Sequence, residues 1–148
     1  MKKSLVAVLV VMLVAVLAAC GGTGTTGGIP EDAALKITGN VNSEVGWSEK
    51  DVRAMDTAQT DFTNKDGETN TYTGVPLNDL LDKARVKSEA TVVVFVADDG
   101  YSAEVTLDEV TACADCIVGF NDGGGFRMVM PDFSNKAQVK GVVEIQVK

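Results

Sequence analysis

The chain has 148 residues, a formal net charge of −8 and no histidine. A chain of this length can bury one hydrophobic core. Its acidic balance opposes contact with a phosphate backbone, so nucleic acid is not an expected partner. Without histidine, the chain has no imidazole for haem or zinc ligation, nor for Ser-His or Cys-His catalysis.

The first 20 residues have the pattern of an export signal. Lys2 and Lys3 precede an apolar run over residues 5–17, and the sequence Leu-Ala-Ala-Cys ends at Cys20. A charged start, a short apolar stretch and small residues before a cleavage point define a secretory signal. Leu-Ala-Ala-Cys also matches the lipobox of bacterial lipoproteins, whose cysteine is acylated. We therefore expect residues 1–19 to be removed as a signal peptide and Cys20 to carry the lipid.

An uncleaved transmembrane anchor is the alternative explanation of this segment. The apolar run is shorter than the roughly 20 residues that cross a bilayer, which favours the lipoprotein. The lipid would hold the protein on the extracytoplasmic face of the cell membrane. Loss of Lys2 and Lys3 lowers the net charge from −8 to −10, so the domain itself should not bind anionic headgroups.

Residues 20–33 are rich in glycine and threonine and have no apolar period. This composition predicts a flexible tether between the lipid and one folded domain over residues 34–148. The alternation of Leu35 and Ile37 with polar neighbours predicts a first strand over residues 35–38. A capping-box pattern that begins at Ser48 predicts a short helix over residues 49–55.

A hairpin is predicted in the next part of the chain. Threonine-rich segments at residues 57–63 and 68–73 flank the turn sequence Asn-Lys-Asp-Gly at 64–67. The glycine of this turn can adopt a left-handed conformation, as a tight hairpin requires. We expect residues 74–76, Gly-Val-Pro, to stop the second strand.

The remaining elements predict an α+β domain. Leu77, Leu80, Leu81 and Ala84 recur on one face of a helix that begins after Pro76. The apolar run at residues 91–97 predicts a central strand. Further strands are expected at residues 101–105, 117–120, 126–130 and 142–147, and a further short helix near Leu107. Together these elements indicate a β-rich, mixed or antiparallel sheet with two or three short helices.

Four stretches carry a family resemblance. They are YTGVPLNDLL (72–81), DDGY (98–101), FRMVMP (126–131) and VKGVVEI (139–145). In this order and spacing they resemble the molybdopterin-binding oxidoreductase domain of the sulfite oxidase type, over roughly residues 35–148. The resemblance implies that fold, in a small stand-alone form.

The resemblance also implies a molybdenum site, which the residues do not supply. Enzymes of this family hold molybdenum through a dithiolene cofactor and one cysteine thiolate, on the strand that corresponds to residues 57–63. This chain has no cysteine there, and hydroxyl and carboxylate groups are harder ligands than a thiolate. We therefore predict no metal and no bound cofactor, with molybdopterin possible by the resemblance alone.

Three residues define a predicted cleft. Tyr72 corresponds to a position beside the family's cofactor cleft, and Arg127 and Lys140 correspond to basic residues of its motifs. We expect a shallow cleft between residues 72–77 and the strands of Arg127 and Lys140. It would hold a small anion, a remnant pterin or the surface of another envelope protein, as in a ligand- or protein-binding accessory module. An active molybdopterin-dependent oxidoreductase with atypical ligation is the enzyme alternative.

Cys113 and Cys116 remain once Cys20 is acylated. A structural disulfide, or two half-buried thiols, is the favoured interpretation in an oxidising compartment. A thiol-redox protein is the alternative, but it requires a thiol of lowered pKa, and the negative charge of Asp115 would raise that pKa. Two thiolates are too few for a structural zinc site. Capture of molybdenum by one of them is disfavoured by their place in the motif order.

Two polar segments resemble cation sites but are better explained as turns. Asp98 and Asp99 precede Gly100, which can supply the positive φ of a turn, with Tyr101 expected to cap the core. Residues 121–125 (NDGGG) lack the ligand spacing of an EF-hand loop, which favours a flexible hairpin.

Overall fold

The structure is a computed structural model, and it describes residues 28–148. The expected signal peptide, the lipid-carrying Cys20 and the first part of the tether lie outside this range. Within it, none of the helices has the length and apolar character needed to cross a membrane.

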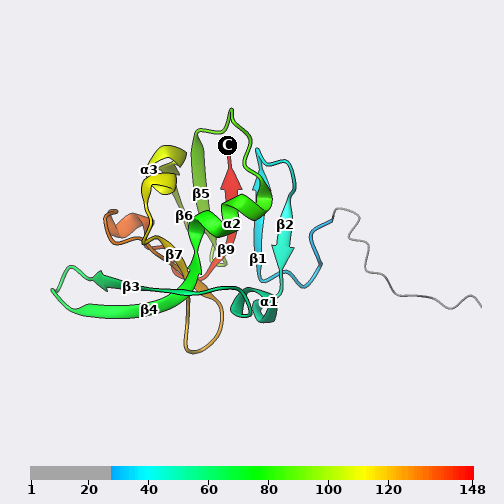
Figure 1. Ribbon diagram of the computed structural model, residues 1–148. Helices are drawn as coiled ribbons and strands as arrows, with labels where there is room; N and C mark the ends of the chain where they lie inside the picture. The colour runs from blue at the N-terminus through cyan, green and yellow to red at the C-terminus, as the bar shows by residue number, and fades with distance from the viewer. Residues whose placement is uncertain (1–27) are drawn as a thin grey trace, which may run out of the picture.

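The larger of two sheets has five strands in the order β2-β1-β9-β5-β6 (Figure 1). Its pairs are antiparallel except for β1 and β9, which run parallel, so the sheet is mixed. The strands are β1 (Leu35–Gly39), β2 (Val45–Trp47), β5 (Val92–Ala97), β6 (Ser102–Thr106) and β9 (Val142–Val147).

The smaller sheet has four antiparallel strands in the order β3-β4-β7-β8. They are β3 (Ala58–Thr63), β4 (Thr69–Pro76), β7 (Ile117–Phe120) and β8 (Phe126–Val129). The β3–β4 hairpin projects from the body of the domain (Figure 1).

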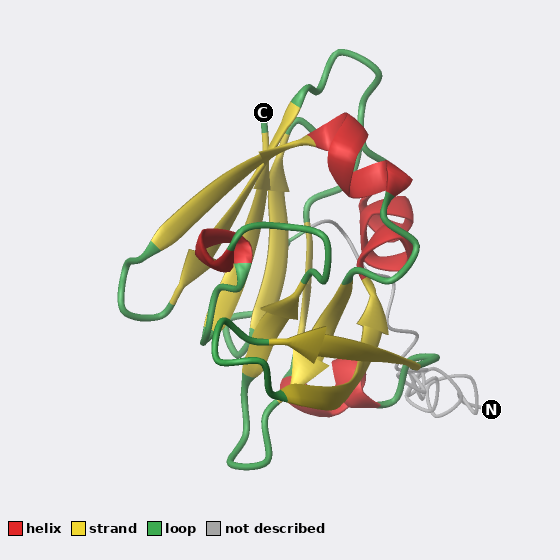
Figure 2. Cartoon of the chain, turned by 90° about the vertical axis from the view of Figure 1, so that its left-hand side faces the viewer, coloured by secondary structure: helices red, strands yellow, loops and turns green. Residues whose placement is uncertain are grey.

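Short helices lie in the connections between the strands (Figure 2). They are α1 (Glu49–Arg53), α2 (Leu77–Ala84), α3 (Leu107–Ala112) and the 3-10 turn η1 (Asn135–Ala137). Ser48 caps α1 as expected, and Thr106 and Glu109 form a capping box at α3. All four predicted apolar positions of α2 are buried. The predicted α+β class, with a β-rich core and short helices, is confirmed.

The core forms where the apolar periods of the strands meet. In β1, Leu35 and Ile37 are fully buried, whereas Lys36 between them is only partly buried. The run of apolar residues in β5 follows from its position between β9 and β6, and Phe95 is fully buried there. Ile145 of β9 pairs with both Ile37 and Phe95, so the centre of the larger sheet is continuous and apolar.

The prediction that residues 74–76 stop the second hairpin strand is wrong. β4 continues through Pro76 and pairs with β7 at Gly74, Val75 and Pro76. The proline is tolerated because its nitrogen points to the side where β3 has already ended, with its last pair at Ala58 and Gly74. This continuation joins the hairpin to the rest of the smaller sheet.

Other differences are smaller. Strand β2 and the turn η1 were not predicted, because three residues each carry too little periodic signal. The turn after β5 forms with Gly100 at φ +87°, as expected. Tyr101 does not cap the core: it is 46% exposed, and its hydroxyl donates to the Lys136 carbonyl at 3.0 Å. A tyrosine hydroxyl needs a hydrogen-bond partner, and the one available to Tyr101 lies at the surface.

Candidate functional site

Tyr72, Arg127 and Lys140 line one hollow of about 580 Å³. Tyr72 comes from β4 and Arg127 from β8, and Lys140 forms an isolated bridge with Arg127. The β3–β4 hairpin forms one wall and the segment after η1 forms the other. The further lining residues are Phe62, Asn64, Lys65, Asp66, Asn70, Asn135 and Gln138. We call this hollow the basic groove.

Arg127 contacts Tyr72 of β4 although β7 lies between their strands, and the residue of β7 beside Arg127 is a glycine. Arg127 pairs with Gly119 on β7, and Gly119 pairs with Gly74 on β4. Residues paired across antiparallel strands point to the same face, so two positions on this row have no side chain. The Arg127 guanidinium carbon lies 4.6 Å from the centroid of the Tyr72 ring, in a cation–π contact.

The cationic side chains of the basic groove are not neutralised by ion pairs within the described residues. Arg127 Nε is buried and has no hydrogen-bond acceptor. Within residues 28–148, neither Arg127, Lys65 nor Lys140 forms an ion pair, and Asp66 is the acidic residue that lines the groove. A buried N–H without an acceptor is costly. In an otherwise acidic domain, this local arrangement suits a ligand that supplies an anionic oxygen.

A second hollow, of about 490 Å³, adjoins the basic groove and shares Asn70, Tyr72 and Arg127 with it. It opens because β4 and β7 separate: β4 pairs with β3 over residues 69–74 but with β7 only over residues 74–76. We call it the β4 slot. Its other lining residues are Thr71, Thr73, Phe120, Asn121 and Asp122.

Helix α1 supports the loop that borders the β4 slot. Arg53 Nη2 donates to the Asn121 carbonyl at 3.0 Å, and its guanidinium carbon lies 4.8 Å from the Phe120 ring centroid. The Arg53 guanidinium hydrogen-bonded to Glu49, together with the Gly125 N–H, holds the pKa of that carboxyl below its ordinary value. Residues 121–125 therefore form an anchored hairpin turn between β7 and β8.

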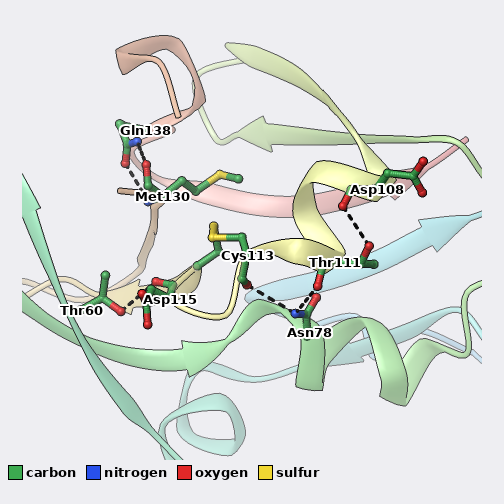
Figure 3. Close-up of a disulfide and its surroundings, with 9 residues drawn as sticks. Thr60, Asn78, Asp108, Thr111, Cys113, Asp115, Met130 and Gln138 are labelled. Atoms are coloured by element: carbon green, nitrogen blue, oxygen red, sulfur yellow. Dashed lines mark hydrogen bonds between the residues drawn. A yellow bond between two sulfur atoms is a disulfide. The ribbon is translucent and has the colours of Figure 1, made fainter. Parts of the chain in front are cut away.

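Cys113 and Cys116 form a disulfide (Figure 3). Cys113 is the C-cap of α3, and Cys116 is 1% exposed. A reactive thiolate needs a partly exposed, electropositive position such as a helix N-terminus. The disulfide lies at the opposite end of its helix, which does not provide that environment.

The disulfide loop is held from two sides, by β3 and by α2 (Figure 3). Thr60 Oγ1 donates to the Asp115 carbonyl at 2.8 Å, and Leu77 N donates to the Cys116 carbonyl at 2.9 Å. Asn78 Nδ2 contacts the Cys113 carbonyl at 3.4 Å. Thr60 is polar but only 5% exposed. Its hydroxyl is satisfied by the hydrogen bond to the Asp115 carbonyl, so it has a structural role.

The donor set does not fit a molybdenum–thiolate centre. The groove-side residues of β3 are Ala58, Thr60 and Phe62, none of which carries sulfur. Both cysteines of the described residues are in the disulfide, and no cluster of three or more carboxylate or thiol groups occurs there. Hydroxyl groups are poor substitutes for a thiolate at this metal. The groove-side residues of β3 therefore lack the family's soft sulfur ligand.

Several lining residues could not be found from the sequence. Lys65 lies in a hairpin turn and Asn135 in η1, and neither belongs to a recognisable motif. Gln138 also lines the groove and fixes its wall, because its side chain bonds both the N–H and the carbonyl of Met130. Only the tertiary fold brings these residues beside Tyr72.

The fold is that of the sulfite-oxidase-type molybdopterin-binding domains. Among solved structures, the chain is similar to the sulfane dehydrogenase SoxCD from Paracoccus pantotrophus, with a TM-score of 0.67 and 20% sequence identity. The similarity covers 78% of this chain and 38% of that chain, so this chain corresponds to well under half of its length.

The sequence family agrees with the fold. The oxidoreductase molybdopterin binding domain family matches residues 25–148, and the chain belongs to this family. No curated protein matches the chain.

Proposed function

We propose that this protein is an extracytoplasmic, lipid-anchored binding module that uses a molybdopterin-binding-type scaffold without molybdenum chemistry. The lipobox at residues 17–20 supports the anchor. The groove supports the binding role. As an accessory protein, it would present this groove to a ligand or to another protein of the cell envelope.

The observation that carries the proposal is the missing thiolate on β3. The strand keeps its place in the sheet and its pairing with β4, yet the hydroxyl of Thr60 faces the interior and is bonded to the disulfide loop. A redox-active molybdenum centre depends on its soft sulfur ligands. A scaffold that retains the groove but lacks this ligand supports binding rather than electron transfer.

Charge determines which ligands fit the groove. Lys65, Arg127 and Lys140 line it without ion-pair partners in the described chain. Charge-assisted hydrogen bonds from guanidinium and ammonium groups to carboxylate or phosphate are about twice as strong as neutral ones. The groove therefore favours an anionic ligand or an acidic protein surface.

Metal and pterin analysis tests this function. The full chain should be produced in a host that makes molybdopterin, purified from its membranes, and analysed for molybdenum by mass spectrometry and for pterin by fluorescence after oxidation. We expect both far below one equivalent. A molybdopterin enzyme purified from the same host shows that cofactor was available. One equivalent of molybdenum with pterin would overturn the proposal in favour of an oxidoreductase with atypical ligation.

A further inference from the structure

Strand β4 has an open edge inside the β4 slot. It pairs with β3 from Thr69 to Gly74, but its pairing with β7 ends at Gly74 and Gly119. On the β7 side, Asn70 and Thr71 therefore line the slot, and no strand of residues 28–148 pairs with them there. Open strand edges are the surfaces to which extended peptides add.

The direction of the main-chain groups can be derived from the two ends of β4. Asn64 N donates to the Glu68 carbonyl, and Leu77 N donates to the Cys116 carbonyl, both at 2.9 Å. Main-chain groups alternate in direction along a strand, so even-numbered residues of β4 face β3 and odd-numbered residues face β7. The N–H and C=O of Thr71 therefore point into the β4 slot, where no strand of the described part of the chain pairs with them.

Arg127 lies at the junction of this open edge and the basic groove. It lines both hollows, and its buried Nε has no acceptor. A ligand that paired with Thr71 as a strand would lie beside Arg127, the cationic residue that lines both hollows. A fitting ligand would form main-chain hydrogen bonds with Thr71 and place an anionic oxygen beside Arg127.

We propose that the β4 slot binds an extended, carboxylate-bearing peptide segment of another envelope protein by strand addition. The segment pairs with the main chain of Thr71, and its carboxylate accepts hydrogen bonds from Arg127, with Lys140 beyond it. This partner is chosen over a free inorganic anion because an ion would leave the N–H and C=O of the open edge unused. The inference rests on the proposed binding role and specifies the partner's chemistry.

Two blocked pentapeptides that differ at one position test the inference. The probes are acetyl-TVEVT-amide and its glutamine counterpart acetyl-TVQVT-amide, titrated into the isotope-labelled full chain in detergent micelles. We expect the Thr71 amide resonance to shift with both, and the glutamate peptide to bind about tenfold more tightly, since charge-assisted hydrogen bonds to a carboxylate are stronger than those to a neutral amide. Arg127→Gln should reduce this preference to less than about twofold, whereas Lys50→Gln, at an exposed position on α1, should preserve it.

The strand-addition step is tested separately from the charge. Thr71→Pro removes the N–H at the open edge and should weaken both peptides, whereas Thr71→Val keeps the N–H and should bind both as the wild type does. Because Thr71→Pro could impair folding, a version of the glutamate peptide that is N-methylated at alternate amides is used with the wild-type chain, and it should not bind.

Three results would overturn the inference: equal binding of the glutamate and glutamine peptides, undiminished binding of the N-methylated peptide, or saturable binding of inorganic phosphate that the glutamate peptide does not displace. Any of these can occur in protein that contains no molybdenum. Failure of this inference is therefore distinguishable from failure of the proposed function.

Discussion

Glycine at position 74 determines how closely β4 approaches β7. A Cβ added at Gly74 would lie 2.1 Å from the Val118 carbonyl oxygen, and one at Gly119 would lie 2.9 Å from Val129 Cγ2. The first contact is with main chain, which cannot move without breaking the pairing at Gly74 and Gly119. A side chain at Gly119 would also crowd Arg127, because a Cβ there would lie 3.5 Å from Arg127 Cγ. One row of the sheet therefore fixes both the strand spacing and the groove.

We predict that Gly74→Ala lowers the free energy of unfolding by about 1–3 kcal/mol, as overpacking in a close-packed interior does. Urea denaturation followed by circular dichroism measures it. Gly123→Ala is the matched control, because a Cβ there meets no atom within 4 Å, and its effect should remain within about 0.5 kcal/mol. A Gly74→Ala variant as stable as the wild type would show that the strands can separate at little cost.

The individual site residues were predictable only in part. Tyr72, Arg127 and Lys140 were selected by family resemblance, and the structure places all three on one groove. The burial of Thr60 was not predictable, because it depends on a hydrogen bond to Asp115, 55 positions away in the sequence. The hydrophobic pattern around Thr60 carries no information on a contact so distant in the sequence.

At the scale of elements, the disulfide loop connects α3 and β7 to the hairpin. Its carbonyl groups accept hydrogen bonds from Thr60 of β3 and Leu77 of α2. The loop thus holds the base of the hairpin that forms one wall of the basic groove. A more mobile loop should therefore increase the mobility of β3, although the two are far apart in the sequence.

We predict that replacing both Cys113 and Cys116 by serine lowers the free energy of unfolding by about 2 kcal/mol, the chain-entropy value for so short a loop. Urea denaturation checks the stability, and amide hydrogen exchange should be faster in β3 of the variant. The wild-type protein should not catalyse insulin reduction. Catalysis that is lost in the variant would instead support the thiol-redox alternative.

Most elements followed from sequence patterns, but their assembly did not. The apolar period predicted β1 and α2, and the Asn-Lys-Asp-Gly turn predicted the β3–β4 hairpin. The division into two sheets was not predictable, because alternation specifies which side of a strand is buried but not which strand lies next to it. For the same reason the pairing of β4 with β7 could not be predicted. Proline usually ends a strand, and the sequence does not show that the nitrogen of Pro76 faces away from β7.

For the whole molecule, attachment to the membrane is a separate question from the fold. The described residues form one domain, and the proposed anchor lies upstream of them. A lipid on Cys20 would contribute about 0.8 kcal/mol per buried methylene group. The acidic domain would add nothing to the attraction for an anionic bilayer.

We predict that Cys20→Ser abolishes incorporation of labelled fatty acid, because serine has no thiol to acylate. Metabolic labelling measures the acylation, and mass spectrometry of the purified protein shows whether residues 1–19 are removed from the wild-type chain. Cys113→Ser, which removes a different cysteine, should leave both results unchanged. A wild-type chain that carries no lipid and keeps residues 1–19 would identify the apolar run at residues 5–17 as an uncleaved transmembrane anchor.

The position of β9 has a consequence for the order in which the domain forms. β9 is the last strand of the domain, yet it lies at the middle of the five-stranded sheet, between β1 and β5. Until residues 142–147 are present, β1 and β2 cannot join β5 and β6, and Ile145 cannot close the core between Ile37 and Phe95. A partly synthesised chain therefore lacks the central strand of this sheet, and on the proposed export route it would still be unfolded when it entered a translocation channel.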